Sequence, residues 1–208
     1  MGWRDSGWLK AGLLIRRCYR SRRADAGCCL SKSLMSRSAV TIRVLDEASD
    51  AACIESARKL LLEYGRFVLS VEGPARFCFG KLEDEVCGLP GTYAAMGGEC
   101  LVAWVNEDAE DAAAGCVTYR ALAAVPGGCE MKRLWVRPAF RGTGLGERLT
   151  LEVLARARVA GFAAVYLDTV PETMGSAFRM YQRLGFVECA PFHESATAGM
   201  LFMRRSLE

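Results

Sequence analysis

The sequence predicts an α+β fold in which a mixed, mostly antiparallel sheet is flanked by helices. Two observations predict this class. Three apolar runs separated by turn residues follow one another in the middle of the chain, as in consecutive antiparallel strands. A strand, an amphipathic helix and another strand come next, which is the pattern of one parallel crossover.

The first predicted elements are a strand and two helices. Residues 40–44 alternate apolar and polar side chains, which is typical of a half-buried strand. Ser49 or Asp50 is expected to cap the next helix, because apolar side chains recur at helical spacing after them. These side chains are Ala52, Ile54, Ala57, Leu60, Leu61 and Tyr64. A shorter helix is predicted over residues 77–86, and the turn-rich stretch 87–93 is expected to be a loop.

The rest of the chain supplies the centre of the sheet, the crossover and the closing strands. Strands are predicted at residues 99–105, 115–121, 129–136 and 163–168, with closing strands at Val187 and residues 200–204. Helices are predicted at residues 145–160, ended by Gly161, and at residues 175–184.

Basic residues are concentrated at the start of the chain. Residues 1–37 hold nine Lys or Arg and two Asp or Glu, whereas the rest holds 18 basic and 22 acidic residues. We therefore expect a basic leader at 1–37, followed by a single domain over 40–208. The leader is interpreted as a disordered extension, a segment upstream of a start at Met35, or an organelle targeting peptide.

Charge and hydropathy also exclude two classes of partner. The predicted domain is mildly acidic, so nucleic-acid binding by this domain is not expected. No stretch reaches the ~18 consecutive apolar residues of a membrane span, so no membrane partner is expected.

Ten cysteines and one histidine bear on metals and on the redox compartment. The cysteines are spread singly, apart from the adjacent pair Cys28-Cys29 in the leader, and no Cys-x-x-Cys pair occurs. With His193 as the only histidine, a zinc site of ordinary spacing is not expected, and no metal is predicted. Buried reduced thiols indicate a reducing compartment and hence a cytoplasmic location, with organelle targeting left open.

A glycine-rich turn between a strand and a helix carries the strongest functional signal. The segment Arg141-Gly142-Thr143-Gly144-Leu145-Gly146 follows an apolar strand and Pro138. Its glycines let the backbone approach a bulky anion, and the N-terminus of the next helix favours negative charge. Arg141 adds a charge-assisted donor. Such a loop can hold a pyrophosphate without a metal.

Three interpretations of this turn compete. A Walker loop requires Lys and Ser or Thr after its last glycine, but Glu147 and Arg148 follow Gly146, which excludes it. A dinucleotide fingerprint requires Gly-x-Gly-x-x-Gly near the start of an alternating βαβ chain, and neither spacing nor order agrees. A glycine-rich turn with no ligand remains open on the glycines alone.

Two motifs together resemble the GNAT acetyltransferase superfamily. Arg-Gly-x-Gly-Leu-Gly after a strand with Val-x-Pro is similar to its acyl-CoA pyrophosphate loop. Residues 177–186, in which Ala177, Tyr181 and Gly185-Phe186 stand out, resemble its second signature. The resemblance covers residues 40–208 and implies the GNAT acyl-CoA N-acyltransferase fold. The sequence is also similar to a bacterial subgroup of this superfamily whose substrate is unassigned.

The resemblance implies transfer of an acetyl group from acetyl-CoA, as co-substrate, to an amine. The backbone of Leu134, Trp135 and Val136 would hold the pantetheine, and Arg141 through Gly146, including Thr143, Gly144 and Leu145, would hold the pyrophosphate. The strand end Leu167-Asp168-Thr169 would form the other wall. The acceptor would be a small-molecule or peptide amine, and a homodimer is compatible with this resemblance.

Two residues are the candidates for proton transfer. Tyr181 matches the tyrosine that protonates the departing thiolate in the family, although a core tyrosine would also fit this helix. Glu130 matches a frequent general base, although a strand-end carboxylate paired with Lys132 is the other interpretation. On an extended strand Glu130 is expected on the same face as Lys132, Leu134 and Val136.

Three further points remain open from the sequence. Met174 stands where many relatives carry an asparagine that positions CoA, and Ser176 or Thr173 could substitute in part. His193 is interpreted as a surface histidine or as a contact to the acceptor. A catalytically silent module that binds or senses acyl-CoA is the main alternative to an enzyme, ahead of a nucleotide-binding domain of another fold.

Overall fold

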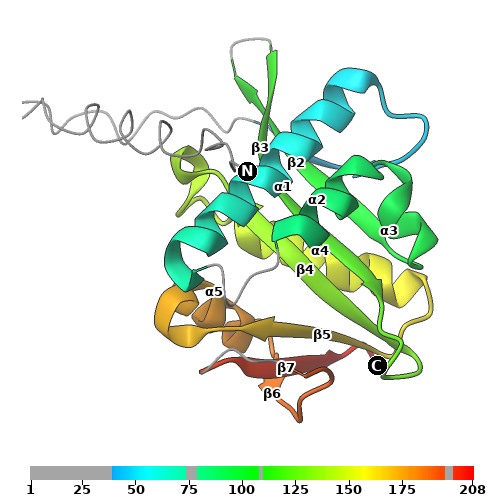
Figure 1. The fold of residues 1–208 in the computed structure, drawn as a ribbon, viewed down its shortest axis with the longest axis vertical. Helices are drawn as coiled ribbons and strands as arrows, with labels where there is room; N and C mark the ends of the chain where they lie inside the picture. Colours follow the sequence, from blue (N-terminus) through cyan, green and yellow to red (C-terminus); the bar gives the residue numbers. More distant parts are fainter. Residues whose placement is uncertain (1–38, 74–78, 108–109, 195–198) are drawn as a thin grey trace, which may run out of the picture. The chain divides into compact units, whose positions relative to one another are not determined.

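The computed structural model describes residues 39–73, 79–107, 110–194 and 199–208. Within these ranges, seven strands form one sheet in the order β1-β2-β3-β4-β5-β7-β6 (Figure 1). The strands are β1 (Val40–Leu45), β2 (Glu99–Glu107), β3 (Glu110–Ala121), β4 (Gly128–Val136), β5 (Ala164–Thr169), β6 (Val187–Glu188) and β7 (Leu201–Ser206). Neighbours are antiparallel except β4 and β5, which are parallel, as the predicted crossover requires.

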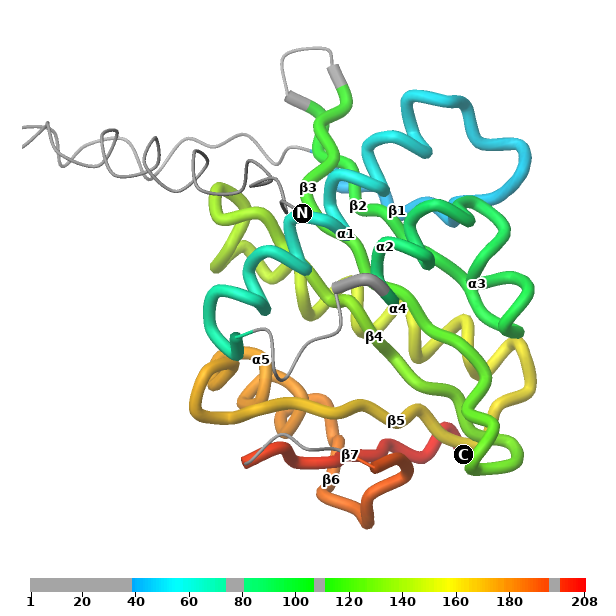
Figure 2. Tube along the Cα trace, viewed as in Figure 1, coloured from blue at the N-terminus to red at the C-terminus, as the bar shows by residue number. Residues whose placement is uncertain are grey.

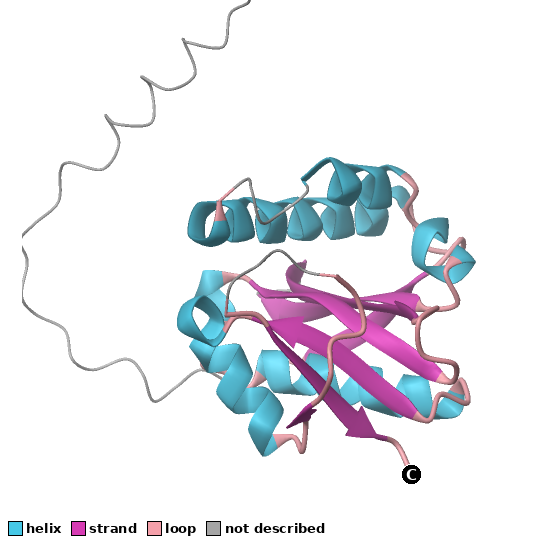
Figure 3. Ribbon diagram, turned by 60° about the horizontal axis from the view of Figure 1, so that its bottom comes forward, coloured by secondary structure: helices cyan, strands magenta, loops and turns pink. Residues whose placement is uncertain are grey.

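Helices cover both faces of this sheet (Figure 3). One face carries α1 (Ala51–Glu72), α2 (Phe79–Cys87) and α3 (Gly91–Ala95), and the other carries α4 (Leu145–Val159) and α5 (Pro171–Arg183). Each face buries its own apolar cluster. The cluster under α1 includes Leu60 and Trp104, and the cluster under α4 includes Leu149 and Val165. The architecture confirms the predicted fold class.

Most predicted elements are confirmed, and Asp50 is the residue that caps α1, since its Oδ1 accepts the Cys53 N–H at 2.7 Å. The expected loop at 87–93 is wrong at its end, because α3 begins at Gly91. Thr92 and Tyr93 both donate hydrogen bonds to Glu85, and these tertiary contacts stabilise a short helix that turn residues do not predict. The leader at 1–37 and Phe77 lie outside the described residues.

The last helix starts earlier than the pattern indicates. Pro171 opens α5 four residues before the predicted start at Gly175, and Met174 interrupts it with non-helical dihedral angles (φ −116°, ψ 33°). The sequence pattern therefore located only the regular part of the helix after this kink. A 3₁₀ turn, η1 (Pro138–Phe140), also precedes the glycine-rich loop.

A β-bulge in β4 changes which side chains share a face. Cys116 of β3 pairs with Trp135, and Thr118 pairs with Lys132, so one residue of β3 opposes two of β4. Arg133 takes up the extra residue with a φ of 58°. Glu130 and Lys132 consequently lie on the α1 face, whereas Leu134 and Val136 pack against the α4 cluster. The expected common face for these four residues is therefore wrong.

A buried ion pair holds the bulge against α2. The Arg133 guanidinium donates to both Glu85 carboxylate oxygens (3.0 and 3.1 Å) and lies over the Tyr64 ring at 5.6 Å. Burial alone would raise the pKa of Glu85, but the hydrogen bonds and charge of Arg133, together with a hydrogen bond from Tyr93, outweigh it and lower that pKa. A left-handed conformation at a non-glycine residue costs about 1–3 kcal/mol, so such a partner is needed.

The thiols behave as small apolar side chains. Cys53, Cys87, Cys100, Cys116, Cys129 and Cys189 are free thiols. Cys100, Cys116 and Cys129 are buried in the sheet, and burial raises the pKa of Cys100 and Cys129 to about 12. Among the helices of the described ranges, none has the length and apolar content needed to cross a membrane.

We predict that Glu85→Ala strongly destabilises the protein, because it leaves the Arg133 guanidinium buried without its carboxylate. Breaking a buried pair costs about 3–5 kcal/mol, measurable as a lower midpoint of denaturant unfolding. Glu55→Ala is the matched control, since the exposed pair Glu55–Lys59 (3.8 Å) is worth at most about 1 kcal/mol. Equal losses in the two variants would contradict the proposed function of this ion pair in stability.

Candidate functional site

The parallel strands β4 and β5 separate along their length. They pair at only three positions in the described sheet, ending with Glu130 opposite Tyr166. Beyond this point the strands diverge (Figure 2), while β4 stays paired with β3 and β5 stays paired with β7. Residues 131–136 of β4 therefore do not pair with β5. This stretch includes Leu134, Trp135 and Val136, the predicted pantetheine contacts.

On the β5 side of the gap, the strand ends at a buried hydroxyl that has no hydrogen-bond partner. Thr169, the last residue of β5, is 3 % exposed, and its hydroxyl is the one buried side-chain oxygen or nitrogen in the described ranges without a hydrogen-bond partner. A buried unpaired hydroxyl costs about 1–3 kcal/mol. A ligand that lies in the gap and offers a polar group would remove this cost.

The glycine-rich loop at the end of the gap has the geometry of an anion cradle. Gly142 and Gly144 have φ values of +77° and +83°, and a Cβ added at either would meet nothing within 4 Å. The first backbone bond that enters α4 runs from the Arg148 N–H to the Gly144 carbonyl at 3.0 Å. The preceding N–H groups lie outside the helical ladder and can donate to an anion.

Arg141 lies beside this loop, stacked on aromatic rings. Its guanidinium carbon is 4.7 Å from the centre of the Trp135 ring and 5.6 Å from that of Phe67. Its Nε donates to the Val136 carbonyl at 3.0 Å, and no carboxylate of the described residues forms an ion pair with it. The remaining guanidinium N–H groups are available to an anion.

Hydrogen bonds and an ion pair from α1 hold the end of β4 that leads into the loop. Glu63 of α1 accepts from the Trp135 indole at 3.2 Å and from the Arg137 guanidinium at 2.9–3.2 Å. Burial alone would raise the pKa of Glu63, but the hydrogen bonds from Arg137 and Trp135 outweigh burial and lower this pKa. Helix α1 thus holds the C-terminal end of β4 at a fixed distance from the loop.

Glu130 lies at the point where the strands part, with both carboxylate oxygens already bonded. Arg120 donates to Oε2 at 2.9 and 3.0 Å, and Lys132 donates to Oε1 at 2.8 Å. The side chain is 1 % exposed. Burial would raise the pKa of Glu130, but Lys132 and Arg120 together lower it. A carboxylate held in this way is a weak proton acceptor, so the geometry does not favour direct proton abstraction by Glu130.

Tyr181 is buried in the cluster under α4, where its ring packs 5.7 Å from that of Phe186. Burial raises the pKa of Tyr181, and the nearby Tyr64 and Asp168 raise it further. Tyr64 belongs to α1 on the opposite face of the sheet. The phenol is therefore neutral and able to donate a proton.

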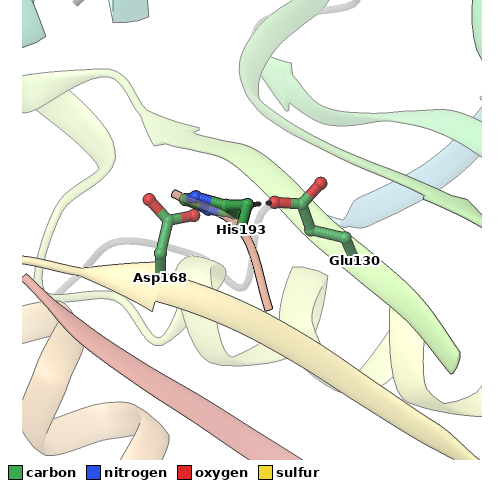
Figure 4. A group of neighbouring side chains, drawn as sticks. All are labelled: Glu130, Asp168 and His193. Atoms are coloured by element: carbon green, nitrogen blue, oxygen red, sulfur yellow. Dashed lines mark ion pairs between the residues drawn. The ribbon is translucent and has the colours of Figure 1, made fainter. Parts of the chain in front are cut away.

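His193 adds a third titratable side chain at the point where β4 and β5 separate, the junction of the two strands. Figure 4 shows its imidazole between the carboxylates of Glu130 and Asp168. One donor atom from each of the three side chains lies within 4.8 Å of the others, and His193 Nε2 is 4.0 Å from Glu130 Oε1. The sequence places these residues on β4, on β5 and in the segment before β7, and only the fold brings them together.

A histidine and two carboxylates this close could also bind a divalent cation. However, the Lys132 ammonium is already 2.8 Å from Glu130 Oε1 and 3.8 Å from Asp168 Oδ1. It supplies the positive charge that these carboxylates require, and a metal ion would have to displace it. The expectation that no metal takes part stays a prediction.

A pocket of about 910 Å³ opens beside His193. Its aromatic wall consists of Tyr166, Phe192 and Phe202, whose rings meet edge to face at 5.0 and 5.6 Å. Polar groups at its edge include His193, Glu194 and Arg204. Residues 189–194 line this pocket, whereas the 89–93 stretch does not.

Sequence reasoning missed three contributors to this site. Glu85 and Arg133 have no motif, because their importance comes from a bulge that the alternating pattern of β4 does not reveal. Tyr64 is predicted only as an apolar position of its helix, and nothing in the spacing indicates its contact with Arg133. For His193, a contact to the acceptor is one of the two interpretations that the sequence offers, but its approach to Glu130 and Asp168 has no signal in the sequence.

Comparisons with known proteins agree with this geometry. The model of the acetyltransferase (GNAT) family matches residues 75–186. An uncharacterised N-acetyltransferase of Schizosaccharomyces pombe is 34 % identical over 126 residues, which is 61 % of this chain and 74 % of the relative.

Solved structures share the fold. An acetyltransferase of the GNAT family from Staphylococcus aureus superposes with a TM-score of 0.63 at 17 % identity, covering 82 % of this chain and 100 % of its own. An acetyltransferase of Salmonella typhimurium, solved with its cofactor acetyl-CoA, superposes with a TM-score of 0.53 at 21 % identity, covering 81 % of this chain and 94 % of its own.

We predict that Glu130→Gln lowers stability at neutral pH but not in acid. The pKa of Glu130 is lowered in the folded protein, so its charge stabilises the fold above the ordinary carboxyl pKa of about 4.3, and this contribution is lost as the pH falls through the folded value. The free energies of unfolding of the two proteins, measured between about pH 3 and 7, should converge at the acid end. A difference that is independent of pH would contradict the ion-pair assignment.

Proposed function

The chain belongs to the acetyltransferase (GNAT) family, and we propose that it transfers the acetyl group of acetyl-CoA to an amine by direct attack in a ternary complex. The observation that carries this proposal is one continuous path. The gap between β4 and β5 starts at Glu130 and leads to the glycine-rich loop at residues 141–146.

We assign the two halves of acetyl-CoA to the two parts of this path. The pantetheine arm lies in the gap, where the backbone of Leu134, Trp135 and Val136 has no strand partner on the β5 side. The unpaired Thr169 hydroxyl on the other wall offers it a further polar contact. The pyrophosphate lies on the N–H groups of residues 142–146, with the guanidinium of Arg141 as counter-charge.

The transfer removes two protons from the acceptor nitrogen and places one on the sulfur. The acceptor ammonium loses its first proton, and its nitrogen then attacks the thioester carbon, forming the C–N bond and a tetrahedral oxyanion. When the C–S bond breaks, the coenzyme A thiolate gains a proton, the nitrogen loses its second proton, and the neutral amide is released. Each positioned acid or base contributes about 10²–10⁴-fold. We assign the proton donor to Tyr181, whose raised pKa keeps the phenol protonated at neutral pH.

We place the acceptor in the pocket beside His193. This pocket lies on the face of the sheet that carries Glu130 and Asp168, and His193 belongs both to its wall and to the cluster at the junction. Its rings suit an apolar or aromatic body of an amine of small-molecule size or of a peptide terminus.

A silent module that binds acyl-CoA without turnover is the second candidate. The observation in its favour is that both oxygens of Glu130, the predicted base, are occupied by Arg120 and Lys132. Consumption of acetyl-CoA across a panel of amines distinguishes the two, because the silent module binds the cofactor and consumes none of it.

We predict that acetyl-CoA raises the melting temperature by about 5–10 °C at a concentration about 100-fold above its Kd, where binding adds ~2.7 kcal/mol. Gly144→Val should abolish this shift, because a side chain would fill the space in front of the N–H groups. The shift is measured by differential scanning fluorimetry.

Gly161→Val is the matched control for this prediction. Gly161 also has a positive φ (+85°) and open space at its Cβ, but it lies at the other end of α4. The control should lose comparable stability and keep the acetyl-CoA shift. If both variants kept the shift, the cradle would be in the wrong place.

We predict that Tyr181→Phe lowers kcat by about 10²-fold or more and leaves acetyl-CoA binding intact, because only the proton donor is removed. Steady-state release of coenzyme A and the thermal shift measure the two quantities. Tyr119→Phe is the control, since Tyr119 is a buried tyrosine of β3 that packs against Phe162. An unchanged kcat in Tyr181→Phe would remove this phenol from the mechanism.

A further inference from the structure

We infer that His193 is the general base of the reaction. This inference rests on the proposed function. In the step, the Nε2 lone pair of His193 takes one proton from the acceptor ammonium. The neutral amine then attacks the thioester carbon, and its nitrogen loses a second proton as the C–S bond breaks, which restores the proton that Tyr181 gives to the sulfur. The proton on the imidazole is released to solvent after the product leaves.

The hydrogen bond on the other ring nitrogen selects the tautomer that this step requires. His193 Nδ1 lies 3.2 Å from the backbone carbonyl oxygen of Glu194. A carbonyl oxygen only accepts, so in the neutral ring Nδ1 carries the hydrogen and Nε2 keeps its lone pair. It is Nε2 that faces the junction, 4.0 Å from Glu130 Oε1.

The ring is held firmly but remains accessible. Phe192 and Phe202 pack edge to face against the imidazole, with ring centres 5.0 and 4.9 Å away. The His193 side chain is nevertheless 35 % exposed and lines the pocket assigned to the acceptor. A base must be fixed in direction and reachable by its substrate, and this position meets both requirements.

The charges around the imidazole come from several elements and suit a ring that becomes positive for part of the cycle. The groups of the same cluster or pocket are Arg120, Glu130, Lys132, Tyr166, Asp168, Cys189, Glu194 and Arg204. Glu130 and Asp168 lie closest and stabilise an imidazolium. Lys132 offsets part of their charge.

Neither neighbouring carboxylate fits the base as well. Glu130 is 1 % exposed and has cations on both oxygens, so it lacks a free lone pair toward the acceptor. Asp168 is 23 % exposed and lies 3.8 Å from the Lys132 ammonium. It remains the residue that would take the role if His193 did not.

The chain offers an unusually direct test, because His193 is its only histidine. Protein labelled with ¹⁵N-histidine gives a single imidazole, and its nitrogen shifts report the tautomer without any substrate. We expect the Nδ1–H form in the neutral ring. An Nε2–H tautomer would overturn the inference, whatever the protein's activity.

Steady-state kinetics of a His193 variant provide the second test. His193→Gln should lower kcat/KM for 2-phenylethylamine by about 10²–10⁴-fold, since this amine is protonated near neutral pH. The loss should be much smaller with hydroxylamine, whose nitrogen is already neutral at that pH. In the wild type, the acid limb of kcat/KM should coincide with the histidine titration seen by NMR, and it should disappear in the variant.

Controls separate this inference from the proposed function. The acetyl-CoA thermal shift should persist in His193→Gln, and Glu188→Gln, an exposed position of β6, should leave kcat unchanged. No thermal shift in the wild type would overturn the proposed function and leave the tautomer test standing. If His193→Gln lost activity equally with both amines, or kept the pH profile of the wild type, His193 would have a structural role. Either result would overturn the inference.

Discussion

The ion pair between Arg133 and Glu85 is the interaction on which the rest of the site depends. It holds a non-glycine residue in a left-handed conformation (φ 58°) and thereby inserts one extra residue into β4. Before the bulge, the strand presents charged side chains to the face with the pocket. After it, the alternation is reversed, and apolar side chains turn to the α4 cluster. The same strand therefore carries charged side chains beside the pocket on one face and part of a hydrophobic core on the other.

Two networks of opposite character meet at the gap that follows the bulge. On the α4 side, Tyr181 is buried among apolar side chains, and burial keeps its phenol protonated. On the α1 side, Glu130 is surrounded by cations that keep it charged. The two environments thus shift the pKa values of a phenol and of a carboxyl in opposite directions. This separation is a common feature of sites that move two protons in one turnover.

The sequence predicted the fold well and located the glycine-rich loop, because both depend on local patterns. Alternation and helical spacing located the strands and helices, and Gly142 and Gly144 marked the loop through their need for positive φ. The acceptor half depends on long-range packing. The bulge at Arg133 has no local signature, so the predicted common face of Glu130 and Leu134 was wrong. The approach of His193 to Asp168 arises only when β7 pairs with β5.

The position of the acceptor pocket along the chain has a consequence for how such proteins diversify. The family match ends at residue 186, and it contains the loop, the gap and Tyr181. Most of the pocket wall, by contrast, lies between Cys189 and Arg204. If the pocket holds the acceptor as proposed, substitutions or length changes in this C-terminal stretch would alter the choice of acceptor and leave the glycine-rich loop and the gap unchanged.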